Sequence, residues 1–361
     1  MSKRGRILVA MSGGIDSSIA AMMLHREGYE VIGMTMKTWD YSSSGGAKKE
    51  TGCCSLDSIN DARTLAVKYG FPHYIINISE EFESFIIDNF VDEYMSGRTP
   101  NPCVLCNTHI KWDALLKRAD QLDCEFIATG HYAQVREEND RYIVSKGVDE
   151  QKDQSYFLWG ISQRNLARTK FPLGTYLKNE IRQIAIDAGL ADLADKNESF
   201  EICFIPDNDY RSFLKRKLNG KKVKIEDGAF VSTDGKPLGK HKGYPFYTVG
   251  QRKGLDISIG VPLYVTEIHA GTNTVVLGEK QYLHKQEMLV KDYNLIKYES
   301  LSSDFQALTK IRYRDPGTMS TINIEDDMIK VVFHRKVSAI APGQSAVFYE
   351  NDDLVGGGVI Q

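Results

Sequence analysis

Residues 6–18 read RILVAMSGGIDSS, and this stretch decides the fold of the first part of the chain. Its apolar beginning predicts a short buried strand, and apolar residues at helical spacing predict a helix from Ser17 to Gly28. Between the two, Gly13 and Gly14 let the backbone turn tightly, and the free amides at the helix start can bind an anion. The segment therefore predicts a strand, an anion-binding turn and a helix.

Strands and helices continue to alternate after this unit. We expect strands at residues 30–36, 74–78 and 125–129 and helices at residues 56–69, 81–95 and 107–121. Strands separated by helices form parallel βαβ units, whose sheet is covered on both faces. Ligands bind beyond the C-terminal ends of such strands, so we expect the functional site at that edge.

The sequence changes character from about Asp209. A basic segment and glycine-rich, strand-prone sequence follow, and from Pro262 onward short alternating runs are separated by turn signals. We therefore expect an α/β parallel-sheet nucleotide-binding domain, a small central domain and an all-β, barrel-like domain. Their predicted limits are residues 1–208, 209–278 and 279–361.

Composition places the chain among ordinary globular proteins. Of 361 residues, 42% are hydrophobic and 26% charged, and 45 Lys and Arg against 48 Asp and Glu leave a net charge of −3. A nucleic-acid site must therefore be a local patch. No run reaches the roughly 18 uncharged apolar residues of a membrane span. Six cysteines are too few for a secreted disulfide framework, so we expect a cytoplasmic protein.

The glycine turn is an unusual phosphate loop. It lacks the lysine of a GxxxxGK[ST] loop and the spacing of GxGxxG, which excludes P-loop NTPases and dinucleotide-binding proteins. Asp16 within a phosphate site indicates a neighbouring cation, and we expect Mg²⁺. Residues 12–17 resemble the SGGxDS loop of the ATP pyrophosphatases, which cleave ATP between its α and β phosphates and adenylate a carbonyl oxygen. A βα turn without a ligand is the alternative.

Cys103 and Cys106 lie in the segment GRTPNPCVLCN, residues 97–107, just ahead of an expected helix. Amides at a helix start favour the thiolate, which attacks sulfur or binds metal. We therefore predict redox or metal chemistry for this pair rather than simple packing. Cys203 lies in the apolar stretch EICFI, which by itself favours a core position. Three further cysteines are interpreted as structural: Cys53, Cys54 and Cys124.

Eight blocks occur together in one order: SGGIDS, NPCVLCN, IATGHY, KDQSYF, EICFI, TVGQRKG, KIRYR and APGQSAVFY. With them the chain resembles the tRNA-specific 2-thiouridylases from residue 10 to about residue 360. The joint occurrence is much more specific than any single block. The resemblance implies an adenine nucleotide alpha hydrolase-like fold for the first domain.

The resemblance also implies a reaction. ATP adenylates the C2 oxygen of the wobble uridine, position 34, in the tRNAs for Lys, Glu and Gln, and sulfur from a persulfide replaces it with release of AMP. By position, Cys203 carries the persulfide, and Cys106 is the nucleophile that releases its sulfur through a transient Cys106–Cys203 disulfide. This agrees with the chemistry, because thiol–disulfide exchange discharges a persulfide.

One position departs from the family pattern. Many relatives carry Asp where this chain has Cys103, at a position that faces the target base, so an acid–base role is not carried over. Instead, Cys103, Cys106 and Cys203 can supply three thiolates to a [4Fe–4S] cluster with one iron open for sulfide. Both routes of sulfur delivery stay open at this stage.

Family positions also imply nucleotide and tRNA contacts. The residues implied for ATP are Ala10, Met11, Ser12, Gly13, Gly14, Ile15, Asp16 and Ser17 at the phosphates, Met36 near the adenine and Gly130, where the backbone approaches the nucleotide. The residues implied for tRNA are Asn101, Pro102, Cys103, Lys152, Asp153, Gln154, Arg312 and Tyr313. Among these, Gln154 suits base-edge hydrogen bonds and Arg312 suits phosphate.

A basic segment lies between the first and last predicted domains. Residues 211–224 hold seven Lys or Arg and no acid, and residues 235–255 add five more, interleaved with Tyr244, Phe246 and Tyr247. Basic groups neutralise phosphates and aromatic rings stack on unpaired bases, which suits an anticodon stem-loop. A solvated charged face is the alternative interpretation.

The expected partners are tRNA and an upstream sulfur donor or persulfide carrier, and we expect a monomer. Two other functions remain as alternatives. An ATP pyrophosphatase for a small-molecule amide or acid explains the phosphate loop but leaves the cysteines unused. A non-enzymatic RNA-binding or iron–sulfur protein leaves the phosphate loop unused.

Overall fold

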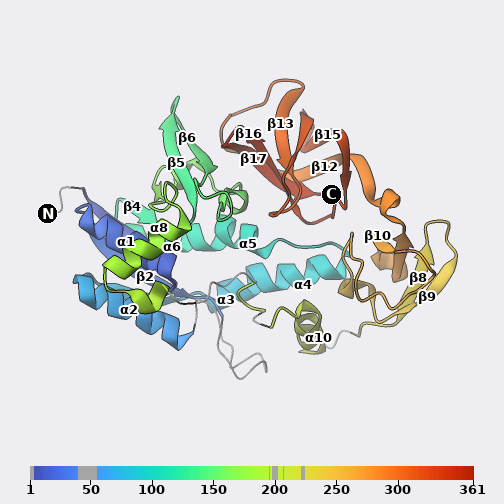
Figure 1. Cartoon of the computed structure of the whole chain (residues 1–361), viewed down its shortest axis with the longest axis horizontal. Helices are drawn as coiled ribbons and strands as arrows, with labels where there is room; N and C mark the ends of the chain where they lie inside the picture. The colour runs from blue at the N-terminus through green and yellow to red at the C-terminus, as the bar shows by residue number, and fades with distance from the viewer. Residues whose placement is uncertain (1–3, 40–54, 195, 197–201, 206, 221–223) are drawn as a thin grey trace. The chain divides into compact units, whose positions relative to one another are not determined.

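The computed structural model describes residues 4–39, 55–194, 196, 202–205, 207–220 and 224–361. The chain divides into two compact units (Figure 1). The first unit comprises residues 1–86, 103–209 and 352–354, and the second comprises residues 87–102, 210–351 and 355–361. Neither unit is a continuous stretch of sequence. Among the described residues, no helix is long and apolar enough to cross a membrane.

A five-stranded sheet forms the centre of the first unit. Its order is β3 (His73–Asn77), β2 (Glu30–Lys37), β1 (Arg6–Ala10), β4 (Phe126–Ala128) and β7 (Thr169–Lys170). All four neighbouring pairs are parallel. Strand β1 lies in the middle, and its three central residues are fully buried. The structure confirms the predicted parallel α/β architecture.

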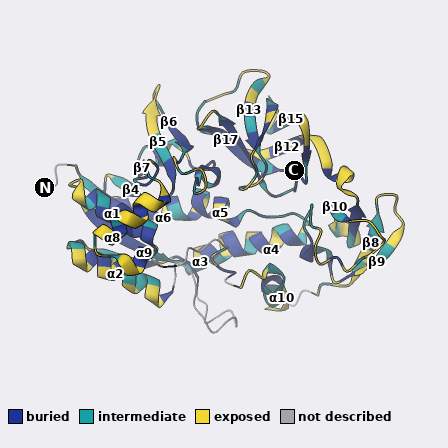
Figure 2. Cartoon of the chain, viewed as in Figure 1, coloured by how far each residue is buried: buried dark blue, intermediate teal, exposed yellow. Residues whose placement is uncertain are grey.

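Helices α1 (Ile15–Arg26), α2 (Leu56–Tyr69) and α8 (Lys178–Asp187) pack around this sheet. Helix α1 shares an apolar cluster with α2 and β1, and a second cluster with α8. Because it serves both clusters, α1 buries eight of its residues. Helix α2 buries only Ala62, Leu65 and Ala66, and the rest of its surface is exposed or half-buried (Figure 2).

Two expected helices begin earlier than predicted. The helix expected at residues 81–95 comprises α3 (Ser79–Phe82), a π-helical turn (Glu83–Ile87) and α4 (Asp88–Met95). The helix expected at residues 107–121 comprises α5 (Pro102–Leu105), a π-helical turn (Cys106–Lys111) and α6 (Trp112–Gln121). Proline fits the first position of a helix, so Pro102 begins this helix and does not belong to a turn that precedes it.

The second unit contains α4, α10 (Tyr210–Gly220) and two β-structures. A four-stranded sheet has the order β10 (Tyr264–His269), β11 (Thr274–Gly278), β8 (Gly228–Ser232) and β9 (Pro237–His241). Strands β8 and β11 are parallel, and the other two pairs are antiparallel. This sheet forms the small central part of the fold.

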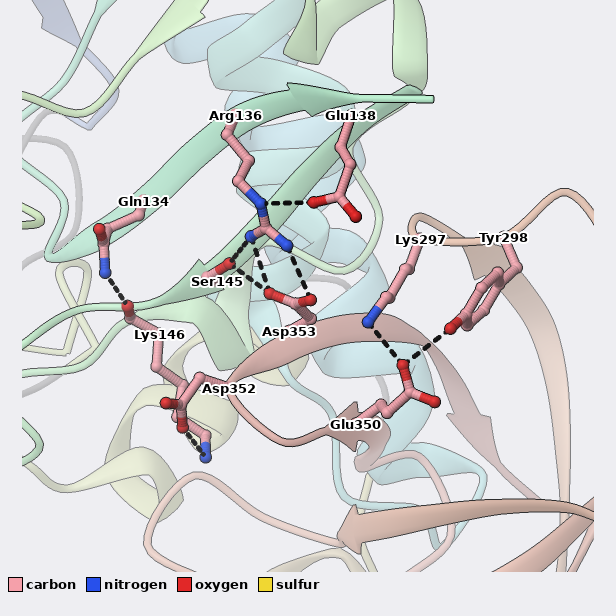
Figure 3. Close-up of polar contacts among 10 residues, drawn as sticks. All are labelled: Gln134, Arg136, Glu138, Ser145, Lys146, Lys297, Tyr298, Glu350, Asp352 and Asp353. Atoms are coloured by element: carbon pink, nitrogen blue, oxygen red, sulfur yellow. Dashed lines mark hydrogen bonds and ion pairs between the residues drawn. The ribbon is translucent and has the colours of Figure 1, made fainter. Parts of the chain in front are cut away.

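A closed barrel forms the rest of the second unit. Its strands follow the order β12 (His284–Leu295), β15 (Met328–Ser338), β14 (Thr318–Glu325), β13 (Phe305–Lys310), β16 (Ser345–Glu350) and β17 (Asp353–Ile360). Pairing of β12 with β17, as between Val290 and Ile360, closes it. Phe333 and Phe348 fill its interior. On its surface Glu350 accepts from Lys297 and Tyr298 (Figure 3). The structure confirms the predicted all-β barrel.

The hairpin of β5 (Ala133–Glu138) and β6 (Arg141–Lys146) in the first unit was not predicted from the sequence. Its turn residues, Asn139 and Asp140, have φ of 52° and 59°. Asn and Asp tolerate this left-handed conformation, which a two-residue hairpin turn requires. Asn139 and Asp140 therefore indicate the hairpin, although its strands are polar and lack the apolar pattern of a buried strand.

Residues Asp352–Leu354 belong to the first unit because they bond to this hairpin. Arg136 on β5 donates two hydrogen bonds to Asp353, at 2.8 and 2.9 Å, and Ser145 on β6 donates another at 2.6 Å (Figure 3). Two parallel N–H to oxygen bonds form the strongest geometry of an arginine–carboxylate pair. The neighbouring Asp352 accepts from the Lys146 ammonium at 3.1 Å but is largely exposed.

We predict that Asp353→Ala lowers the free energy of unfolding by about 1–2 kcal/mol, because it leaves Arg136 and Ser145 without their shared acceptor. Asp352→Ala is the matched control. Its side chain is 80% exposed, so its loss should cost about 0–1 kcal/mol. Urea unfolding of both variants measures the difference. Equal stability of the two variants would contradict the importance of the Asp353 pair.

Candidate functional site

The phosphate loop joins β1 to α1 at the C-terminal edge of the sheet, as predicted. The Ser17 hydroxyl oxygen accepts from the Ser12 amide at 3.0 Å, lies 3.2 Å from the Ser12 hydroxyl and donates to the Gly14 carbonyl at 3.2 Å. These bonds fix the loop around the first turn of α1. A fixed loop at a helix start presents amide donors and positive partial charge to an anion.

Two glycines allow other segments to press against this loop. Gly13 has a φ of 72°, and a Cβ there would lie 1.9 Å from the Ser58 carbonyl oxygen of α2. At Gly130 a Cβ would lie 2.8 Å from the Asp16 carbonyl carbon and the Ser17 amide nitrogen. In the structure, Gly130 thus allows the segment after β4 to approach the phosphate loop itself.

The carboxylate of Asp16 is held by two side chains that the sequence analysis missed. The Lys178 ammonium on α8 lies 2.6 and 2.8 Å from its two oxygens, and the Tyr132 hydroxyl donates to Oδ1 at 2.8 Å. The Lys178 side chain is only 5% exposed. The cation that the sequence predicted beside Asp16 is therefore supplied, in this structure, by the chain itself.

The geometry of Asp16 also leaves room for Mg²⁺. A carboxylate offers about four acceptor positions, and Lys178 and Tyr132 use three. Mg²⁺ in nucleotide sites binds one or two carboxylates, and phosphates and water complete its shell. The remaining position on Asp16 fits that pattern.

Other residues implied for ATP contribute in different ways. The side chains of Met11 and Ile15 are buried in the two apolar clusters around α1, so only their backbone can face a ligand. Ala10 is half-buried at the end of β1. Met36 is half-buried near the end of β2, where a ligand at the sheet edge can reach it.

The cysteines differ in position and environment. Cys203 is exposed, whereas its neighbours Phe204 and Ile205 are buried, and Phe204 packs on Phe82 with ring centres 5.8 Å apart. The apolar stretch is therefore core, but its cysteine faces solvent. Cys124 is buried, as a structural residue should be. Cys53 and Cys54 lie outside the described residues.

Cys103 lies in the first turn of the helix that begins at Pro102, and Cys106 is its fifth residue. Cys103 is exposed and Cys106 is buried. The expected lowering of the Cys103 pKa is not found, because the protein atoms around the sulfur raise the pKa and the Lys111 charge only partly opposes them. Solvent at this exposed residue moderates the rise. Cys106 lies beyond the first turn, where the effect of the helix start fades.

The three candidate cluster ligands do not form a metal site in this arrangement. Within the described parts of the chain, which include Cys103, Cys106 and Cys203, no group of three His, Cys, Asp or Glu residues could hold a metal ion. A [4Fe–4S] cluster needs its thiolates around one centre. The cysteines as placed here do not fit a cluster.

His131 follows Gly130 and packs against the rings of Trp112 and Phe171. Its Nδ1 lies 2.7 Å from the Thr129 hydroxyl. Burial, and to a smaller extent the Lys111 charge, lower the pKa of His131 to about 3. The imidazole is therefore neutral at pH 7.

The segment 149–154 contains three of the residues implied for tRNA, and the side chains of Asp153 and Gln154 accept hydrogen bonds from neighbouring amides. Asp153 is buried and accepts from the amides of Gly147 and Ser155. Gln154 uses its side-chain oxygen to accept from the Tyr132 amide at 3.0 Å. Gln154 Oε1 already accepts one hydrogen bond, and the contact of this residue with a base edge stays a prediction. Lys152 is half-buried.

The remaining tRNA candidates belong to the second unit, apart from the exposed Cys103. Arg312 is exposed and Tyr313 is half-buried. Asn101 donates to the Ser345 hydroxyl at 3.5 Å, and Pro102 is buried. Arg312 is thus the most accessible of these four.

The basic segment of the second unit corrects one expectation. Phe246 and Tyr247 are buried, so they are core residues and not stacking platforms for bases. The cations of α10 lie over them: Arg211 is 5.6 Å from the Tyr247 ring centre and Lys215 is 5.1 Å from that of Phe246. The Tyr244 hydroxyl donates to the Met95 carbonyl. The aromatic rings orient the basic side chains instead of contacting RNA themselves.

The parallel sheet and phosphate loop define a nucleotide-binding α/β protein, and comparison with known proteins defines the family. Residues 5–207 match the model of a tRNA methyl transferase HUP domain, residues 211–279 a tRNA methyl transferase PRC-barrel domain, and residues 285–360 an aminomethyltransferase beta-barrel domain.

Full-length relatives are more specific. The chain is 62% identical to the tRNA-specific 2-thiouridylase MnmA of Cytophaga hutchinsonii, over 100% of this chain and 98% of that protein. It is 56% identical to the protein of the same name from Salinibacter ruber, over 100% and 95%. The chain belongs to the tRNA-specific 2-thiouridylase family, and it is an enzyme.

A solved structure of a 4-thiouridine synthetase–RNA complex with bound ATP also resembles the chain. It is 16% identical and covers 60% of this chain and 51% of its own, with a TM-score of 0.38.

We predict that Gly13→Ala weakens ATP binding more than tenfold, because a Cβ would overlap the α2 backbone and displace the loop. Gly28→Ala is the matched control. Gly28 also has a positive φ, of 92°, but no atom lies within 4 Å of a Cβ there. That variant should lose about 1–2 kcal/mol of stability and keep its nucleotide affinity. Calorimetric titration with ATP decides, and wild-type affinity in Gly13→Ala would contradict this account of the loop.

We also predict a pH effect from His131. Its pKa is lowered from 6.5 to about 3 on folding, so between these values the unfolded chain binds a proton that the folded chain does not. Above pH 6.5 the ring is neutral in both states and does not change the free energy of unfolding. As the pH falls below 6.5, the free energy of unfolding decreases by at most about 1.4 kcal/mol per pH unit. His131→Gln should flatten the unfolding free energy between pH 6.5 and 4.

The control for this experiment is His109→Gln, which changes an exposed histidine in the π-helical turn Cys106–Lys111. Its pH profile should match that of the wild type. An unchanged slope in His131→Gln would show that the ring is not kept neutral by the fold.

Proposed function

We propose that this chain catalyses ATP-dependent 2-thiolation of the wobble uridine, position 34, in the tRNAs for Lys, Glu and Gln. The observation that carries the proposal is that the phosphate loop, Cys106 and Cys203 all belong to one compact unit of a chain 62% identical to a 2-thiouridylase. The loop suits activation of an oxygen by ATP, and an exposed cysteine suits delivery of sulfur.

In the first step the uracil C2 oxygen attacks the α-phosphorus of ATP, and pyrophosphate leaves. The loop residues Ser12 and Ser17 and the start of α1 orient the phosphates, and the buried Lys178 keeps Asp16 in place beside them. Bound Mg²⁺, held by Asp16 and the phosphates, would offset their negative charge. The C2 oxygen thereby becomes part of a leaving group.

In the second step a Cys203 persulfide supplies the sulfur. The Cys106 thiolate attacks the inner sulfur of that persulfide, which forms the Cys106–Cys203 disulfide and releases hydrosulfide. Hydrosulfide attacks C2, AMP leaves with the original oxygen, and a proton is lost to give the thiocarbonyl. A cellular dithiol then reduces the disulfide. An upstream carrier protein restores the persulfide, and the exposure of Cys203 makes it accessible to such a donor.

We propose the persulfide route rather than the cluster route, because it requires only Cys106 and Cys203. Cys103, Cys106 and Cys203 do not gather around one point among the described residues, so we derive no step through a [4Fe–4S] cluster. Cys103 is exposed at the helix start, and the resemblance implies that the residue at this position faces the target base. We infer that the enzyme acts as a cytoplasmic monomer.

RNA binding is proposed for basic side chains that the fold leaves accessible. These are the half-buried Lys152 in the first unit, and the half-buried Arg211 and the exposed Lys215 and Arg312 in the second. Cations oriented over rings lose less conformational freedom when they bind phosphate. A methyl transfer, which the descriptions of the matched domain models name, would leave the phosphate loop and cysteines unused. A small-molecule amide or acid as substrate would leave the basic groups without a role.

The test is the reaction itself. Purified protein with ATP, Mg²⁺, a persulfide donor and unmodified tRNA for Glu should form 2-thiouridine, detected by nucleoside mass spectrometry. We expect Cys203→Ser and Cys106→Ser each to lower the rate at least a thousandfold, because each removes a sulfur that the second step requires. AMP formation shows whether the first step survives.

Cys124→Ser is the matched control, because this buried cysteine lies outside the proposed chemistry. It should retain activity. Full thiolation by either Cys203→Ser or Cys106→Ser would refute the assigned roles. Absence of 2-thiouridine in the wild-type reaction and in cells that express it would refute the proposed function.

A further inference from the structure

The two residues whose side chains hold Asp16 also form hydrogen bonds with the segment 149–154. Lys178 holds Asp16 with its ammonium, and its backbone amide donates to Asp149 Oδ2 at 2.9 Å. The Asp149 carbonyl accepts from the Lys152 amide at 3.0 Å, and its Oδ1 accepts from the Gln151 amide at 3.1 Å. Lys178 therefore connects the phosphate loop to the beginning of this segment.

Tyr132 makes the second connection. Its hydroxyl donates to Asp16, while its backbone bonds to Gln154 in both directions. The Gln154 amide donates to the Tyr132 carbonyl at 2.8 Å, and the Tyr132 amide donates to Gln154 Oε1 at 3.0 Å. Tyr132 thus connects the same carboxylate to the end of the segment.

Hydrogen bonds hold the segment between these two connections. Asp153 is only 6% exposed, and its two oxygens accept from Gly147, from the Ser155 amide and from the Ser155 hydroxyl, at 3.0 to 3.1 Å. A buried carboxylate with this many donors holds its loop in one conformation. A movement of either end is therefore transmitted to the whole segment.

Packing against apolar side chains prevents Tyr132 and Lys178 from moving independently of Asp16. Tyr132 is buried in the cluster that joins α1 to α8, together with Ile15, Ile19 and Ile181. Lys178 is the first residue of α8 and is itself buried. A buried ammonium requires its charged partner, so Lys178 follows Asp16 when the phosphate loop adjusts.

We propose that Tyr132 and Lys178 are positioning residues that couple nucleotide binding at the phosphate loop to RNA binding at the segment 149–154. The inference rests on the proposed function. Phosphates and Mg²⁺ that enter beside Asp16 compete with Lys178 and Tyr132 for its negative charge, and both ends of the segment respond. By thermodynamic reciprocity, RNA on the segment must change nucleotide affinity by the same factor.

The experiment measures this factor directly. The dissociation constant of α,β-methylene-ATP, which the enzyme cannot cleave, is determined with and without saturating unmodified tRNA. We expect the wild-type values to differ by about fivefold or more. Tyr132→Phe removes only the hydroxyl and keeps both backbone bonds to Gln154, so it should reduce the factor while the protein stays folded. Lys178→Met should reduce it further, and Lys178→Arg should restore part of it.

Two matched controls remove similar contacts elsewhere. Tyr142→Phe deletes a hydroxyl that donates to Glu137 at 3.0 Å, and Lys297→Met deletes an ammonium that pairs with Glu350 at 2.5 Å. Both should keep the wild-type factor. Thermal unfolding verifies that each variant is folded. If Lys178→Met is not folded, the result for Tyr132→Phe alone tests the coupling.

A wild-type factor of one overturns the coupling. An unchanged factor in Tyr132→Phe overturns it too, even if that variant binds nucleotide more weakly, because a purely local role would give that result. The outcome is separable from the proposed function. A wild-type enzyme that forms 2-thiouridine but shows no coupling refutes this inference alone, whereas one that binds no tRNA refutes both.

Discussion

A buried ammonium is the constraint on which the site depends. Lys178 reaches the phosphate loop from the start of α8, at a position 5% exposed, where an unpaired charge would cost several kcal/mol. Asp16, 162 residues earlier, supplies the partner charge. Helix α8 must therefore dock on α1 with its first turn at the phosphate loop, and the apolar cluster between the two helices assembles around that pair. The Lys178–Asp16 pair sets the position of α8 on α1, and apolar packing provides most of the buried area between the two helices.

Local patterns predicted the parts of the fold that depend on local physics. The strand, turn and helix of residues 6–26 were readable because apolar spacing and two glycines fix them within one stretch. The parallel sheet followed from the alternation of such units, and the barrel followed from short strands and turn signals. The starts of two helices were wrong, in one case because Pro102 begins a helix.

Side-chain partners were much harder to predict. No pattern marks Lys178, because its partner is distant in the sequence and a lysine at a helix start is ordinary. Gln154 was assigned to tRNA from its family position and Tyr247 from its residue type. The fold bonds Gln154 Oε1 to the Tyr132 amide, which no sequence pattern indicated, and it buries Tyr247. Cys203 shows the opposite case, since an apolar stretch surrounds a cysteine that faces solvent. Position within a motif predicted candidate residues, and only the structure shows which surfaces they present.

The hairpin of β5 and β6 has a consequence for how the chain folds as it is made. Its arginine, Arg136, pairs with Asp353, which leaves the ribosome more than two hundred residues later. Synthesis at about 5–20 residues per second separates the two by at least roughly ten seconds. During that interval the phosphate loop, its sheet and the hairpin can form, but Arg136 and Ser145 lack their Asp353 partner until the last strand is made. The first unit to begin folding is therefore also among the last to be completed.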